Sequence, residues 1–144
     1  MNAQEMWNDY SVKENVIADY DAWAFGDAPD ELAQLVLAGI NTGTASAYPL
    51  YPLEGEELPK SGEYSVILDS TENAVCIIRT TKVYVAPFEK VGAGHAYREG
   101  EGDRSLAYWR KVHEDFFTAE LAEAGLKFDR QMLVVCEEFE KVYP

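Results

Sequence analysis

Basic residues are scarce in this chain of 144 residues, which has 12 Lys and Arg against 26 Asp and Glu and a formal charge of −14. Proteins that hold nucleic acid along its backbone need a basic face to neutralise the phosphates. The composition therefore argues against a broad nucleic-acid footprint, and no DNA partner is expected. It leaves open the recognition of a single nucleotide in a small pocket.

Long apolar runs and secretion signals are also missing. No apolar stretch approaches the roughly 20 residues that a membrane-spanning helix needs, and residues 1–5 lack the basic and apolar parts of a signal peptide. We therefore expect no membrane association and a cytoplasmic location. Hydrophobic residues make up 47% of the chain, which suits one domain with a substantial core.

Cysteine is rare as well. Cys76 and Cys136 each lie in an apolar, strand-like run, which predicts buried and reduced thiols. A disulfide would require the two strands to be neighbours, which the sequence leaves open. No spacing of Cys and His fits a zinc site.

Helical and strand patterns are interleaved irregularly along the chain. Apolar spacings of three and four predict one or two helices over 2–24, a helix between Pro29 and Gly39, and a long helix over 105–124. Alternation predicts strands over 63–69, 73–85 and 131–142, with a helical turn at 88–91. Residues 41–46 are a small polar segment, and 48–62 are expected to form an irregular loop. This order favours an α+β domain, with a small β-barrel or curved mixed sheet flanked by helices, over repeated βαβ units.

The run from Glu99 to Asp103 has three carboxylates separated only by glycine. Glycine is disfavoured in helices and strands, so the run predicts a loop that brings acids close to another backbone or to a ligand. Crowded carboxylates raise one another's pKa, and such a group can act as a general base. The alternative is a solvated acidic turn before the long helix.

The same three acids are also candidate metal ligands. Their oxygen ligands would suit magnesium or calcium, but the run lacks the ligand series of an EF-hand loop. No metal and no other cofactor is therefore expected.

Polar side chains after the second predicted helix form another candidate site, comprising Asn41, Thr42, Thr44 and Ser46. They can bond a carbonyl or phosphate of a ligand, or they can cap the helix and fill a turn. Arg79, Arg98 and Arg104 are candidate phosphate anchors that can equally pair with nearby acids.

The two histidines differ in their sequence context. His95 lies near the acidic run and is the better candidate for site chemistry, although a surface role is equally open. His113 lies on the apolar stripe of the long helix and is interpreted as a core residue.

Three segments together resemble the ASCH domain family, whose members have a fold similar to the PUA RNA-binding domain. Residues 39–46 are similar to the family's glycine, lysine and threonine-rich turn. Residues 96–103, followed by a Trp/His helix, resemble a subgroup with alanine, two residues and then glutamate–glycine. The third segment is the strand around 136–139. The resemblance covers about 27–143 and implies one ASCH-like domain over 1–144, with residues 1–26 as an N-terminal helical extension.

The resemblance implies a cleft that binds RNA or a modified nucleoside. Some members are amidohydrolases that remove the acetyl group of N4-acetylcytidine, and another is a ribonuclease. In the amidohydrolases a motif lysine is the nucleophile, a threonine three residues later assists, and a glutamate acts as base.

The chain matches these roles only in part. Thr44 matches the threonine and Glu99 the glutamate, whereas Asn41 replaces the lysine and Ser46 replaces a common arginine. An amide nitrogen cannot attack an acyl carbon because its lone pair is delocalised, so Asn41 is expected to hydrogen-bond instead.

The leading hypothesis is a polar cleft that binds a nucleoside, a nucleotide or an RNA end. Its expected ligand contacts are Asn41, Thr42, Ser46 and Arg98, and its expected catalytic residues, if it is an enzyme, are Thr44 and Glu99. One alternative is a hydrolase in which Glu99 activates water directly. Another is an interaction module that binds no nucleic acid. The oligomeric state is left open, and the leading hypothesis requires Asn41, Thr44 and Glu99 to converge on one pocket.

Overall fold

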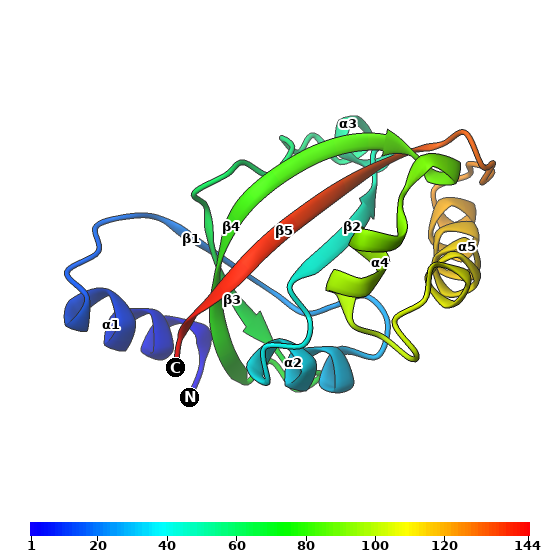
Figure 1. Cartoon of the computed structure of the whole chain (residues 1–144). Helices are drawn as coiled ribbons and strands as arrows, with labels where there is room; N and C mark the ends of the chain where they lie inside the picture. The colour runs from blue at the N-terminus through cyan, green and yellow to red at the C-terminus, as the bar shows by residue number, and fades with distance from the viewer.

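The structure is a computed structural model that describes all 144 residues (Figure 1). Helices pack around one sheet in the order α1 (Ala3–Lys13), β1 (Tyr20–Trp23), α2 (Pro29–Leu37), β2 (Gly43–Ala47), α3 (Leu50–Glu54), β3 (Tyr64–Leu68), β4 (Ala74–Pro87), η1 (Phe88–Lys90), α4 (Ala93–Glu99), α5 (Leu106–Glu123) and β5 (Leu133–Tyr143). The α+β class is confirmed. No helix combines the length and apolar character needed to cross a membrane.

A single five-stranded sheet with the order β1-β3-β4-β5-β2 forms the framework. Strands β1 and β3 run parallel, and the other neighbours are antiparallel. The long strands β4 and β5 arch across the molecule, and their register shifts twice, a feature that bends and twists a sheet (Figure 1). Because β1 and β2 remain edge strands, the sheet is the curved, mixed form of the prediction and does not close into a barrel.

Three hydrophobic clusters fix the helices to this sheet. On β3, Val66 packs with Trp7 of α1, whereas the adjacent Ile67 packs with Val36 of α2. Successive strand side chains point to opposite faces, so α1 and α2 cover opposite faces of the sheet. The largest cluster joins α5 to β5, with Phe117 and Val134 fully buried in it.

The structure confirms several element boundaries that local sequence signals predict. Helix α2 starts at Pro29 and is followed by Gly39 at φ +78°, and Ser105 caps α5 by accepting a hydrogen bond from the Tyr108 backbone N–H. Strands β3, β4 and β5 and the turn η1 lie where the patterns place them. Cys76 and Cys136 are buried in different clusters and form no disulfide.

Other predictions were wrong where pairing partners override local preference. Residues 20–23 form β1 rather than helix because they pair in parallel with β3, and residues 43–47 form β2 because β5 supplies the hydrogen-bonding ladder. The loop over 48–62 contains the short helix α3. Glu99 is the last residue of α4, so the acidic loop begins one residue later, at Gly100.

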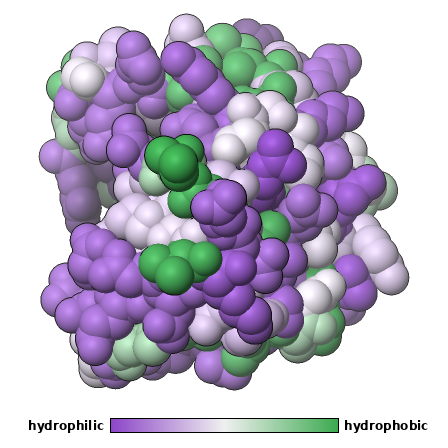
Figure 2. Space-filling model, turned by 90° about the vertical axis from the view of Figure 1, so that its left-hand side faces the viewer, coloured by the Kyte–Doolittle hydropathy of each residue, from purple (hydrophilic) through white to green (hydrophobic).

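The surface is mainly hydrophilic, as the composition requires. Figure 2 shows one face on which polar side chains dominate and hydrophobic ones form small separate groups. Scattered exposed apolar residues are normal for a folded domain.

Replacing Gly100 by alanine should destabilise the junction between α4 and β2. Gly100 has φ +74°, and an added Cβ would lie 2.8 Å from the Ile40 carbonyl oxygen. We expect Gly100→Ala to lower the free energy of unfolding in urea by about 2 kcal/mol or more. Gly94→Ala is the matched control, because a Cβ there meets nothing within 4 Å in a helix; it should be neutral or stabilise by about 0.5–1 kcal/mol. Equal effects of the two variants would contradict this assignment.

Candidate functional site

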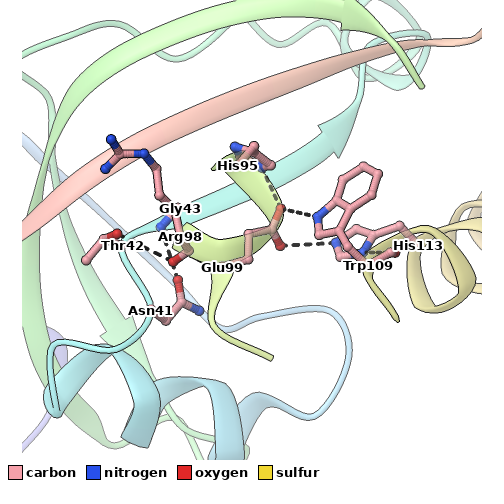
Figure 3. Close-up of polar contacts among 8 residues, drawn as sticks. All are labelled: Asn41, Thr42, Gly43, His95, Arg98, Glu99, Trp109 and His113. Atoms are coloured by element: carbon pink, nitrogen blue, oxygen red, sulfur yellow. Dashed lines mark hydrogen bonds and ion pairs between the residues drawn. The ribbon is translucent and has the colours of Figure 1, made fainter. Parts of the chain in front are cut away.

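Glu99 is the centre of a buried polar network between α4 and α5 (Figure 3). Its Oε2 accepts hydrogen bonds from the Trp109 indole Nε1 and from His95 Nε2, each at 2.6 Å. Its Oε1 lies 3.1 Å from His113 Nε2. Because the residue is only 4% exposed, these partners replace the water that an ionised carboxylate needs.

The hydrogen bonds of His113 define where its protons are. His113 Nδ1 lies 2.8 Å from the Trp109 carbonyl oxygen, which can only accept, so Nδ1 carries a proton. Nε2 can then donate to Glu99 only if the ring is protonated. Burial alone raises the pKa of Glu99, but His113 and His95 lower it to about 2; burial lowers the pKa of His113, but Glu99 raises it above its usual value. Both pKa shifts favour the charged forms, so Glu99 and His113 form a carboxylate–imidazolium pair.

This network brings together the rings of His95, Trp109 and His113 from two helices. His95 and Glu99 are one helical turn apart on α4, as are Trp109 and His113 on α5. The Trp109 and His113 rings stack at a centroid distance of 4.2 Å. Three donors and a low pKa make Glu99 a weak proton acceptor and favour a positioning role.

The turn before β2 uses its polar groups internally. Asn41 Oδ1 accepts a hydrogen bond from the Gly43 backbone N–H at 3.2 Å, and Thr42 donates both its backbone N–H and its hydroxyl to the Arg98 carbonyl oxygen (Figure 3). The Arg98 guanidinium is half exposed and lies 3.6 Å from a Glu138 carboxylate oxygen. These contacts fasten β2 to α4.

A cleft of about 860 Å³ is lined by β2, by residues 21–26 and 56–60, and by Glu137 of β5 and Phe116 and Glu120 of α5. Its charged lining comprises six acids, Asp21, Glu56, Glu57, Glu63, Glu120 and Glu137, and one base, Lys60. Its aromatic lining comprises Trp23, Phe25, Tyr51 and Phe116. The cleft is therefore acidic and partly aromatic.

Glu137 lies opposite Thr44 in the β2–β5 ladder, and both line the cleft. Burial, with a smaller contribution from the negative charge of Glu63, raises the pKa of Glu137 to about 7. Ser46 also lines the cleft, and its hydroxyl lies 2.7 Å from the Tyr51 hydroxyl. These groups offer both donors and acceptors to a ligand.

A second, much smaller cavity of about 60 Å³ adjoins the cleft. Glu99, Glu101, His113 and Thr44 all line it, and Thr44 also lines the large cleft. Burial, together with the negative charges of nearby acids, outweighs the opposing effect of His113 and raises the pKa of Glu101 to about 7.

Thr44 and Glu99 therefore meet at one cavity and Ser46 lines the adjoining cleft, whereas Asn41, Thr42 and Arg98 line neither. Sequence reasoning missed Glu137. The signal for Glu137 was an acid directly after the apolar run 132–136. Its pairing with Thr44 depends on the register of β2 against β5, which the sequence does not reveal.

Neutralising Glu99 should weaken the fold in a pH-dependent way. The lowered pKa of Glu99 stabilises the folded state above pH 4.5, and this contribution is lost as the pH falls toward 2. The raised pKa of His113 stabilises the folded state below pH 6.5. This contribution is lost as the pH rises through the pKa that His113 has in the folded state. We expect Glu99→Gln to lower the free energy of unfolding by about 2–3 kcal/mol near pH 5.5 and by less near pH 3.

The control for this variant is Glu89→Gln, which removes an equal charge at an exposed position of η1. It should change stability by less than about 0.5 kcal/mol. A loss for Glu99→Gln that is as small as the control's, at every pH, would show that the network is not ionised.

Glu137 should make the stability of the fold depend on pH in a second range, between about 4.5 and 7. Its pKa is raised from 4.5 to about 7, so between these values the folded state holds a proton that the unfolded state has released. Stability therefore falls as the pH rises through this range, by roughly 2 kcal/mol for this group. Glu137→Gln should flatten the fall by that amount, while Glu140→Gln, exposed on the same strand, should leave it unchanged. Parallel pH profiles for wild type and Glu137→Gln would overturn the assignment.

Comparisons with known proteins agree with this architecture. The family model described as ASCH domain matches residues 21–143. The ASCH domain structure from Lactobacillus crispatus JV V101 is 32% identical, with a TM-score of 0.90, and the match covers 98% of this chain and 94% of that one. Protein EF3133 from Enterococcus faecalis V583 is 39% identical, with a TM-score of 0.91 over 99% of this chain and 88% of that one.

A more distant structure, the hypothetical protein PH0355, shares the fold at 17% identity, with a TM-score of 0.59 over 86% of this chain and 100% of that one. The search of curated proteins gave no match. The family match spans the sheet, α2, α4 and α5, and with them both cavities. The chain therefore belongs to the ASCH domain family.

Proposed function

We propose that this ASCH domain binds a nucleoside, or one exposed nucleotide of an RNA, in the acidic cleft. The observation that carries the proposal is the placement of Thr44, Ser46 and Glu137 along the cleft among aromatic side chains. Single-stranded RNA is commonly recognised by stacking unpaired bases on aromatic rings and by hydrogen bonds to their edges. The family resemblance supports the same class of ligand.

The charge of the cleft further narrows the range of ligands that it can bind. Six acids and one lysine would repel a chain of phosphates laid along the cleft. An uncharged nucleoside, or a base inserted with its phosphate outside, avoids this repulsion. The recognised part of the ligand is therefore the base rather than the backbone.

Glu137 favours a base that carries an exocyclic amine. A carboxylate accepts a hydrogen bond from the N4 amine of cytosine, whereas uracil presents an acceptor oxygen at that position. Since the pKa of Glu137 is about 7, the carboxylate form is accessible near neutral pH. Cytidine is thus the preferred nucleoside among the pyrimidines.

Hydrolysis is the second candidate function, and Glu137 rather than Glu99 favours it. A general base works best when its pKa lies near the working pH, a condition that Glu137 at about 7 meets and Glu99 at about 2 does not. Thr44, opposite Glu137, would supply a hydroxyl close to the reacting group. Release of acetate from N4-acetylcytidine by the purified chain would establish this function, whereas binding without release limits the protein to recognition.

Calorimetric titration with cytidine, uridine and cytidine 5′-monophosphate tests the proposal. Cytidine should bind more tightly than uridine, and the phosphate should add no affinity because the cleft is acidic. Glu137→Gln should weaken cytidine binding by about tenfold, because a charge-assisted hydrogen bond to the amine becomes a weaker neutral one. Thr44→Val should weaken it by about fivefold through loss of one neutral hydrogen bond.

Glu140→Gln is the matched control on β5 and should bind cytidine like the wild type, since Glu140 does not line the cleft. The proposal fails if none of the nucleosides binds, which would favour an interaction module that recognises no nucleic acid. It also fails if Glu137→Gln and Glu140→Gln bind cytidine equally well.

A further inference from the structure

We infer that His113, Glu99 and Glu101 form a binding site for one divalent transition-metal ion, with Zn²⁺ as the best-suited ion. Each residue offers one ligand atom, and the three atoms lie within 4.8 Å of one another. The site differs from the three carboxylates considered in the sequence, because His113 takes the place of Asp103. The Asp103 carboxylate instead accepts a hydrogen bond from the Ser105 backbone N–H.

His113 has the orientation of a metal ligand. Its Nδ1 donates to the Trp109 carbonyl oxygen at 2.8 Å, which leaves Nε2 as the nitrogen that faces the two carboxylates. Histidines that bind metals almost always donate their other ring N–H to a carbonyl or carboxylate, since this fixes the tautomer and the ring plane. With an ion bound, Nε2 would present its lone pair in place of the proton it shares with Glu99.

Glu99 is held in the same manner. His95 and Trp109 both donate to Oε2, so the carboxylate is fixed and Oε1 is the oxygen directed at His113. The distance from Oε1 to His113 Nε2 is 3.1 Å. Two ligands at the usual zinc distances and a tetrahedral angle lie about 3.3 Å apart, so Glu99 and His113 need little movement to admit an ion between them.

Glu101 can close the site from the loop after α4. It is flanked by Gly100 at φ +74° and Gly102 at φ +58°, and its side chain lines the small cavity with Glu99 and His113. The cavity of about 60 Å³ exceeds the roughly 30 Å³ that one water occupies in the liquid. It has room for an ion and for a further ligand on its open side.

One nitrogen and two carboxylate oxygens select the kind of ion. Imidazole suits zinc and other transition metals, whereas magnesium and calcium prefer all-oxygen sites. Three protein ligands with a position left open are typical of catalytic rather than structural zinc sites. All three residues line the small cavity that Thr44 shares with the large cleft, so the metal site adjoins the cleft.

Calorimetric titration of the tag-free, chelator-treated full chain with Zn²⁺ tests this inference without any nucleoside present. We expect one ion per chain, with Mg²⁺ at the same concentration failing to compete. Glu101→Gln should weaken Zn²⁺ binding at least about tenfold, and it should leave the fold intact because Glu101 lies partly exposed in a loop. Glu89→Gln should bind Zn²⁺ like the wild type, since Glu89 is exposed and does not line the small cavity.

A crystal of the zinc complex should give an anomalous peak within bonding distance of His113 Nε2, Glu99 and Glu101. The inference is overturned if the folded chain takes up no Zn²⁺, if Glu101→Gln binds as tightly as Glu89→Gln, or if the peak lies elsewhere. Because the metal alone is the probe, its failure leaves the nucleoside proposal standing, and failure of nucleoside binding leaves the metal site standing.

Discussion

The buried carboxylate of Glu99 is the constraint on which the arrangement of α4, α5 and β2 depends. An ionised group at 4% exposure would be very costly without compensation, and the donors from His95, Trp109 and His113 provide that compensation. These donors come from two helices, so satisfying one charge fixes the position of α4 relative to α5. The hydrophobic packing around Phe117 then completes a helix pair whose relative position is already determined.

The same interaction positions the cleft indirectly. The Arg98 carbonyl oxygen, next to Glu99 at the end of α4, accepts two hydrogen bonds from Thr42 and thereby fastens the start of β2. Strand β2 in turn pairs Thr44 with Glu137 of β5. The chain of contacts thus leads from the buried charge of Glu99, through the end of α4, to the polar wall of the cleft. Glu99 orders the structure, whereas Glu137 lines the cleft.

Much of this architecture could be predicted from the sequence where the signal is local. The periodicity of α5, the proline and glycine around α2 and the alternation in β4 each act within one segment, and each gave the right element. Strands β1 and β2 could not be found in this way, because their state is decided by partners at 64–67 and 134–138. The resemblance identified Glu99 as important, but only the structure gives its three donors. Placing Glu137 in the cleft required the register between β2 and β5, which are distant in sequence. His113 is buried, as its interpretation as a core residue implies, but it is also paired with Glu99.

The division of roles between the two glutamates can be measured directly by NMR, by following the side-chain carboxyl carbons of ¹³C-labelled glutamate through a pH titration, with Glu99→Gln and Glu137→Gln used to assign the signals. The predicted result is that Glu137 titrates at about pH 7, while Glu99 remains ionised until the pH approaches about 2. The contradicting result is the reverse order: a Glu99 signal that titrates near neutral pH and a Glu137 signal that titrates near 4.5, the ordinary value for glutamate.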